Sequence, residues 1–122
     1  MTDERKRAGD WGENLATNHL VRKGYGIVAR NWRAGRAGEL DIVARDGDTL
    51  VVVEVKTARG RTMGHPMTWV TPQKREQIAR VTEVFLSAYC DEYETVRFDV
   101  IAVDASVRPP RVEHIVDAWR PA

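Results

Sequence analysis

Apolar and polar residues alternate along residues 38–57, in two runs separated by the turn signal Asp46-Gly47-Asp48. Alternation with a period of two is typical of strands that bury one face. Two such runs around a short turn predict a β-hairpin. The side chains predicted to face inward are Leu40, Ile42, Ala44, Val51, Val53 and Val55.

The length of the turn decides which side chains of this hairpin face one another. A two-residue loop, the commonest hairpin connection, allows a register in which Asp41 stands opposite Glu54. A three-residue loop without a bulge would place these two carboxylates on opposite faces and would separate the apolar positions as well. We therefore predict a polar face that carries Glu39, Asp41, Glu54 and Lys56.

Two other segments have the spacing of amphipathic helices. The first covers residues near 4–23 and is ended by Gly24. The second is opened by Thr71 as N-cap and Pro72 at the first helical position, and it runs to about Cys90. Residues on one side of each helix predict the buried face. They are Ala8, Gly9, Trp11, Gly12, Leu15, Ala16 and Leu20 in the first helix, and Ile78, Val81, Phe85 and Ala88 in the second.

Three further strands complete the predicted fold, near residues 25–32, 95–103 and 111–118. A helix as long as 72–90 can cross over between two parallel strands. The order of elements therefore predicts an α/β fold with a mixed sheet of about five strands and a helix against each face. We expect residues 1–122 to form a single domain.

Asp41 and Glu54 carry the most informative chemistry. Carboxylates opposed across a strand pair lie about 5 Å apart at Cβ and repel one another unless a cation or a shared proton lies between them. Mg²⁺ takes one or two protein carboxylates and keeps several waters, which leaves positions for phosphate oxygens and an attacking water. Lys56 shares their face and could orient or deprotonate that water. The alternative is a solvated hairpin face with ordinary surface charges.

Asp41 followed by Glu54-Val55-Lys56 resembles the D...(D/E)xK signature of the restriction-endonuclease-like nucleases, a superfamily that includes the archaeal-type Holliday-junction resolvases. The likeness extends over nearly the whole chain. The segments GxxGE from Gly9 to Glu13, GELDIV, VEVKT, TPQK, RFDVIAV and VEHIVDAW are together similar to the YraN-like family of small uncharacterised bacterial proteins.

The resemblance implies a restriction-endonuclease-like core and a DNA endonuclease that depends on Mg²⁺ or Mn²⁺. Such an enzyme would act on branched or single-stranded DNA in repair or recombination. Asp41 and Glu54 would bind the metal and Lys56 would assist the water. Glu13 matches an acidic residue on the first helix of resolvase-like members, which joins the metal cluster and the catalytic group. Glu39, two residues from Asp41 on the same face, is a further candidate ligand.

Charged residues are distributed unevenly, although the formal net charge is only +1. Residues 1–36 and 57–75 are basic, whereas residues 37–56 net −3 and residues 76–104 net −5. An acidic metal site between basic stretches suits a nuclease, because phosphates must be drawn toward carboxylates that repel them. Ordinary solubilising charge is the alternative. The predicted DNA contacts are Arg33, Arg36, Arg59, Arg61, Gln73, Lys74 and Arg75.

Two groups of these predicted contacts have a local rationale. Residues 30–36 mix arginines with Trp32 in an expected mobile loop, which suits phosphate contact and base stacking. The alternative for Trp32 is a half-buried residue at the sheet edge. Residues 73–75 occupy the first turn of a predicted helix, where free backbone N–H groups and the helix dipole favour an anion.

Composition narrows the class of protein. Hydrophobic residues make up 43% and charged residues 30% of the chain, which is typical of a globular protein. No apolar run approaches the roughly 20 residues that span a bilayer, and no hydrophobic signal segment follows the first residues. We therefore expect a cytoplasmic protein without a membrane partner. A lone cysteine, Cys90, excludes an internal disulfide.

Two other functions remain open from the sequence. A non-catalytic nucleic-acid-binding or adaptor domain could keep the same fold, and so could a structural partner in a larger assembly. A symmetric homodimer would suit a four-way DNA junction, but no residue pattern fixes the oligomeric state.

Overall fold

The secondary-structure elements follow the predicted order and have nearly the predicted bounds. The computed structural model describes residues 4–58 and 69–121. Among the helices of these residues, none has the length and apolarity to cross a membrane. The elements are α1 (Glu4–Arg22), β1 (Gly26–Arg33), the short 3-10 helix η1 (Gly35–Ala37), β2 (Glu39–Asp46), β3 (Thr49–Ala58), α2 (Pro72–Ala88), β4 (Thr95–Asp104) and β5 (Arg111–Trp119).

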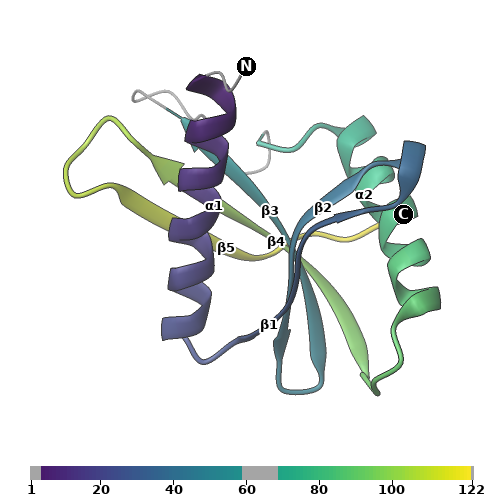
Figure 1. The fold of residues 1–122 in the computed structure, drawn as a ribbon. Coiled ribbons are helices and arrows are strands. Elements are labelled where there is room, and N and C mark those ends of the chain that lie inside the picture. The colour runs from purple at the N-terminus through teal and green to yellow at the C-terminus, as the bar shows by residue number, and fades with distance from the viewer. Residues whose placement is uncertain (1–3, 59–68, 122) are drawn as a thin grey trace.

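The strands form one mixed sheet in the order β1-β2-β3-β4-β5 (Figure 1). Strands β3 and β4 pair in parallel, and the other neighbours are antiparallel. Helix α2 connects the two parallel strands and packs on one face of the sheet, while α1 covers the other. The predicted α/β fold is confirmed, and it is consistent with a restriction-endonuclease-like core.

The β2–β3 hairpin has the predicted register. Ile42 pairs with Val53 and Asp46 pairs with Thr49, so the turn consists of Gly47 and Asp48. Gly47 has a φ of 60°, a left-handed conformation that glycine adopts without steric cost. The alternation of apolar residues and the turn signal were therefore enough to fix the pairing.

Beyond Ile42 and Val53, strands β2 and β3 separate. Strand β3 continues beside β4 as far as Ala58, whereas β2 continues beside β1 (Figure 1). Where the strands part, the Asp41 carboxylate accepts a hydrogen bond of 2.9 Å from the backbone N–H of Val55. A side chain thus replaces part of the strand ladder at this point, which we call the fork.

Each face of the sheet carries its own hydrophobic core. The expectation that Leu40 shares a face with Ile42 is wrong, because Leu40 packs under α2 and Ile42 under α1. Alternation is interrupted between them at Asp41, where β2 leaves β3. The expectation of a polar hairpin face is also wrong away from the fork, since a helix on each side requires apolar residues on both faces. The hairpin residues buried under α2 are Leu40, Val43, Leu50 and Val52.

Helix α1 is buried along a narrower stripe than predicted. Gly12, Ala16 and Leu20 are buried and lie four residues apart, on one line along the helix. A Cβ at Gly12 would overlap the Oγ1 of Thr57, so this glycine permits the close approach of α1 to β3. Trp11 is 40% exposed, and a Cβ at exposed Gly9 would meet no atom within 4 Å. Their predicted burial is wrong. Trp11 lies off this line, whereas Gly9 lies on it, in a turn of the helix that precedes the contact with β3.

Residues 30–36 do not form the loop that their composition indicates. They continue β1 to Arg33 and then enter η1. Trp32 pairs with Leu40, and its ring lies edge-on to Phe85 with 5.2 Å between the ring centroids. Backbone pairing with β2 and packing under α2 thus outweigh the polar composition of this segment. Trp32 is partly buried, as the alternative interpretation expected.

Candidate active site

Carboxylates from three elements approach one another at the fork. Asp41 comes from β2, Glu54 from β3 and Glu13 from α1. Glu54 and Glu13 are only 6% and 7% exposed. Asp41 is close enough to both that its negative charge contributes to a raised pKa of each. The structure therefore brings together these three candidate residues.

Glu54 lies beside two lysines. Its Oε2 is 3.6 Å from the Nζ of Lys56 and 4.0 Å from the Nζ of Lys74. Burial and the charge of Asp41 raise the pKa of Glu54 to about 7, and the lysines offset this rise only in part. At neutral pH the carboxyl group is thus near the balance between its two protonation states.

The first turn of α2 brings Lys74 to the fork. Thr71 caps the helix, because its Oγ1 accepts a hydrogen bond of 3.2 Å from the backbone N–H of Lys74. The next residue, Arg75, turns its Nε to the carbonyl oxygen of Val70 at 3.0 Å. Lys74 was predicted as a phosphate contact, and its ion pair with Glu54 was not foreseen. One signal for this ion pair was available in the sequence: Lys74 is a cation in the first turn of the helix that follows the Glu-x-Lys strand.

Glu13 is held by side chains of β1. Its Oε1 accepts hydrogen bonds from Asn31 Nδ2 at 2.8 Å and from an Arg30 guanidinium nitrogen at 3.3 Å. Burial and the charge of Asp41 raise the pKa of Glu13, and these two donors counter the rise only in part. Sequence reasoning missed Asn31. The signal was an asparagine within a predicted strand, where this residue is uncommon.

Of the remaining predicted residues, some have no hydrogen bond or ion pair with this cluster within the described part of the chain, and two lie outside it. Glu39 forms an ion pair with Arg33 at 3.2 Å, and within the described residues it has no hydrogen bond to the three clustered carboxylates. Arg36 and Gln73 are exposed. Arg59 and Arg61 lie outside the described residues.

The donors at the fork fit a divalent cation held by two carboxylates. Within residues 4–58 and 69–121, no three His, Cys, Asp or Glu side chains are grouped so that they could hold a metal ion by themselves. Mg²⁺ does not need such a group, because it is usually bound by one or two carboxylates and keeps several waters. Asp41 and Glu54 supply this pair. Burial first, and then the negative charge of Asp41, raise the pKa of Glu54, so a cation between the two carboxylates would relieve the second of these effects.

We expect the metal-free protein to lose stability as the pH rises from 5 to 8, relative to a Glu54→Gln variant. The folded-state pKa of Glu54, about 7, lies above the ordinary value of 4.5. Folding therefore favours the protonated carboxyl group, and this stabilisation is lost as the pH rises through about 7. The difference in unfolding free energy should change by on the order of 2 kcal/mol between the two pH values.

Urea denaturation in EDTA at pH 5 and pH 8 measures this difference. Glu83→Gln replaces an exposed glutamate on α2 and is the matched control. If the difference in unfolding free energy between wild type and Glu54→Gln is the same at both pH values, the pKa of Glu54 is not raised by burial and by the charge of Asp41.

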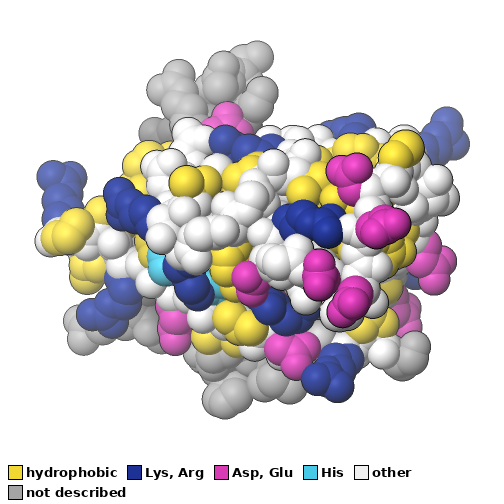
Figure 2. Space-filling model, turned by 90° about the horizontal axis from the view of Figure 1, so that it is seen from below, with side chains coloured by type: hydrophobic (Ala, Val, Ile, Leu, Met, Phe, Trp, Pro, Cys, Tyr) yellow, Lys and Arg dark blue, Asp and Glu magenta, His cyan; other side chains and the backbone are white. Residues whose placement is uncertain are grey.

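The two ends of the molecule differ in charge. Both helices begin, and β3 ends, at the end that carries the fork (Figure 1). Helix N-termini favour anions. The opposite end, which Figure 2 shows, carries exposed acidic residues of the β2–β3 turn and of the segment before β4. Lysine and arginine side chains lie among them in the same view (Figure 2). The acidic residues are Asp46, Asp48, Asp91, Glu92 and Glu94.

A second polar network surrounds Asp99, which is 0% exposed. Its carboxylate accepts hydrogen bonds from Arg97 at 2.9 and 3.0 Å and from the backbone N–H of Asp117 at 2.9 Å. The His114 Nε2 lies 2.7 Å from the same carboxylate. Burial alone would raise the pKa of Asp99, but these partners hold it below the ordinary value. The network ties β5 to β4 beside the irregularity in their pairing.

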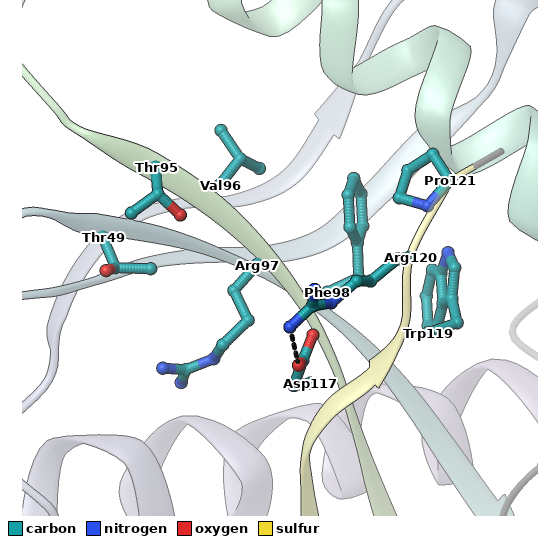
Figure 3. A pocket seen from close by; sticks show the side chains of 9 residues that line it. All are labelled: Thr49, Thr95, Val96, Arg97, Phe98, Asp117, Trp119, Arg120 and Pro121. Atoms are coloured by element: carbon teal, nitrogen blue, oxygen red, sulfur yellow. Dashed lines mark hydrogen bonds and ion pairs between the residues drawn. The ribbon is translucent and has the colours of Figure 1, made fainter.

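Two clefts of about 410 Å³ each lie around Trp119, Arg120 and Pro121. The cleft in Figure 3 lies at the first residues of β3 and β4, and within it Asp117 pairs with Arg120 at 3.0 Å. The other lies along α2 and contains one acidic residue, Glu76. Neither cleft is lined by the carboxylates of the fork, so their volume adds nothing to that chemistry.

Comparison with known proteins identifies relatives over nearly the full chain. Residues 12–103 match a family described as "Uncharacterised protein family UPF0102". A UPF0102 protein of Streptomyces coelicolor is 47% identical over 108 residues, which cover 87% of this chain and 83% of that protein. UPF0102 proteins of Roseiflexus castenholzii and Geobacter metallireducens are 44% and 42% identical, with coverage of 94% and 98% of this chain and 94% and 97% of theirs. The chain therefore belongs to the UPF0102 family.

Proposed function

We propose that this protein is a nuclease that uses a divalent metal ion to hydrolyse phosphodiester bonds of DNA. The observation that carries the proposal is the pairing of Asp41 with buried Glu54 beside Lys56 and Lys74. Acidic groups suited to a cation, with basic groups next to them, are the parts that metal-assisted hydrolysis requires.

Each residue has a role that follows from its position. Asp41 and Glu54 would hold Mg²⁺ or Mn²⁺, which supplies positive charge for the phosphate and water of lowered pKa. Lys56, whose side chain is 39% exposed, would orient the attacking water or stabilise charge that develops on the phosphate. Lys74 would bind a phosphate oxygen at the start of α2. Glu13 would complete the acidic cluster.

Charge and resemblance support DNA as the substrate. The acidic end opposite the fork would turn a polyanion toward the helix N-termini, and exposed Arg33, Arg36 and Gln73 would make further contacts. The D...(D/E)xK segments of Holliday-junction resolvases resemble Asp41 and Glu54-Val55-Lys56, which supports branched or single-stranded DNA and a role in repair or recombination in the cytoplasm. A symmetric pair of chains would address the arms of a junction.

A non-catalytic DNA-binding adaptor is the second candidate function. The observation in its favour is that no three metal-ligating side chains form a group within the described residues. This function would use the charge asymmetry of the surface and would not need an ion at the fork.

Incubation of the purified protein with labelled four-way junction, flap, single-stranded and duplex DNA tests the proposal. We expect cleavage in Mg²⁺ or Mn²⁺ and none in EDTA, with activity that co-elutes with the protein on a sizing column. Binding without cleavage in either metal would favour the adaptor. Absence of both binding and cleavage would overturn both DNA functions.

A further inference from the structure

A lysine, a histidine and a buried aspartate form a chain of contacts between the end of α1 and the β4–β5 pair. The Nζ of Lys23 lies 2.9 Å from Nδ1 of His114, and Nε2 of the same ring lies 2.7 Å from the carboxylate of Asp99. The side chain of His114 is 3% exposed and Asp99 is 0% exposed, whereas Lys23 is an exposed residue. The three groups therefore lead from the surface into the protein, and none of them belongs to the fork.

The neighbours of His114 determine which of its ring nitrogens carries the proton. A lysine ammonium group has donors only, so Nδ1 accepts from Lys23 and carries no proton. The ring proton is then on Nε2, which donates it to Asp99. Hydrogen bonds from Arg97 and from the backbone N–H of Asp117 hold the Asp99 carboxylate in place. His114 is therefore an oriented base whose lone pair faces the amine of Lys23.

Further contacts fix the position of Lys23. Its backbone N–H donates to the carbonyl oxygens of His19 and Leu20, at 3.1 Å each, where α1 ends. Its Nζ lies 5.7 Å from the centroid of the Tyr25 ring, within the range of a cation–π interaction. The amine is thus held beside its base before any reagent arrives.

We propose that Lys23 is a site of acylation by acyl phosphates, with His114 as the general base and Asp99 as the group that orients it. A nucleophile within roughly 2.6–3.2 Å of a base that a third group orients is the arrangement that activates side chains for covalent chemistry. An acyl phosphate carries negative charge, which Lys23 and exposed Arg22 attract. The inference does not depend on the metal chemistry proposed for the fork.

The reaction needs no further reactant. The ammonium group of Lys23 passes one proton to Nδ1 of His114, and Asp99 stabilises the imidazolium that forms. The neutral amine attacks the acyl carbon, so that a C–N bond forms and the C–O bond to the phosphate breaks. The phosphate takes the second amine proton and leaves as hydrogen phosphate, and His114 returns its proton to water. The product is an amide on Lys23 that keeps one N–H.

Acetyl phosphate is the probe, and it is added to the full chain in EDTA together with a free lysine derivative, Nα-acetyl-lysine amide. Heavy-isotope acetic anhydride then labels every amine that has not reacted, and mass spectrometry gives the acetylated fraction of each lysine. The chain has four lysines, of which Lys56 and Lys74 pair with Glu54. A positioned general base contributes at least on the order of 100-fold. We expect Lys23 to react faster than the free derivative by about this factor.

Two variants test the role of the base. His114→Gln removes the imidazole, and its Lys23 should react on the order of 100-fold more slowly than that of the wild type. Glu113→Gln is the matched control, because Glu113 is the exposed neighbour of His114 on β5. It should keep the wild-type rate at Lys23. A thermal melt shows whether each variant is folded.

The comparison within wild type needs no variant, so it decides the question even if His114→Gln does not fold. If Lys23 of the folded wild type reacts no faster than the free derivative, the proposal is overturned. Fast acetylation of Lys23 that persists in folded His114→Gln would overturn the role of His114 as the base.

Discussion

Replacement of Asp41 by asparagine is expected to reduce DNA cleavage by roughly two to three orders of magnitude, the range seen when a charge-stabilising group is lost. Asparagine keeps the size of the side chain, and its amide oxygen can still accept the hydrogen bond from Val55, which is 2.9 Å long in the wild type. The fold should therefore survive. The variant lacks the negative charge that a hard divalent ion requires of its ligands.

Initial cleavage rates in Mg²⁺ and a thermal melt measure the two parts of this prediction. Asp48→Asn is the matched control, since Asp48 is an exposed carboxylate in the turn at the other end of the same hairpin. Its activity should equal that of wild type. If folded Asp41→Asn cleaves DNA at the same rate as the wild type, the fork is not the active site. If the inactive Asp41→Asn variant binds DNA with the same affinity as the wild type, Asp41 is needed for catalysis and not for substrate binding.

Replacement of Asp99 by asparagine is expected to lower the unfolding free energy by about 3–5 kcal/mol, the usual cost of breaking a buried charge pair. The carboxylate is 0% exposed and accepts hydrogen bonds from two side chains and a backbone N–H. An amide would turn an NH₂ group toward donors and would remove the carboxylate nearest to the Arg97 guanidinium, which would keep the carboxylate of Asp46 at 3.6 Å. Because Arg97 is only partly buried, the lower end of this range is the firmer expectation.

The same variant has a characteristic dependence on pH. The folded-state pKa of Asp99 is held below the ordinary value of 3.8. Its stabilisation is therefore complete above about pH 4 and is lost as the pH falls further. Denaturation at pH 7 and near pH 3 should show a smaller difference between wild type and Asp99→Asn at the lower pH. Asp91→Asn, at an exposed position, is the control. A loss below about 1 kcal/mol at pH 7 would show that the network does not stabilise the fold.

Local sequence signals were sufficient for the elements and for the hairpin register. Alternation in residues 38–57, the short turn and the Thr71-Pro72 helix start act over a few neighbouring residues, so they can be read without knowledge of the fold. The predicted order of elements and the pairing of Ile42 with Val53 follow from them. The same signals predicted that Asp41 and Glu54 would meet.

Contacts between distant segments could not be predicted in this way. The orientation of α1 is set by the close contact between Gly12 and Thr57 of β3. Helical spacing does not reveal this contact, so it could not predict that Trp11 is exposed. The face of Leu40 depends on the separation of β2 from β3. Composition also failed for residues 30–36, where edge-strand pairing overrides polarity.

In the candidate site, too, local signals predicted some residues, whereas contacts between distant segments could not be predicted. Asp41, Glu54 and Lys56 follow from one hairpin, whereas Glu13 was placed by resemblance. The contact of Lys74 with Glu54 depends on the path of the chain between β3 and α2. The contact of Asn31 with Glu13 depends on a single backbone angle. Neither leaves a periodic pattern in the sequence.

The separation of β2 from β3 gives the acidic residues two mechanical supports. Asp41 belongs to the β1–β2 pair, whereas Glu54 and Lys56 belong to β3, which β4 holds in register through Ala58. The 2.9 Å hydrogen bond from the Val55 N–H to the Asp41 carboxylate joins the two pairs where their ladder ends, and an ion held by Asp41 and Glu54 would join them a second time.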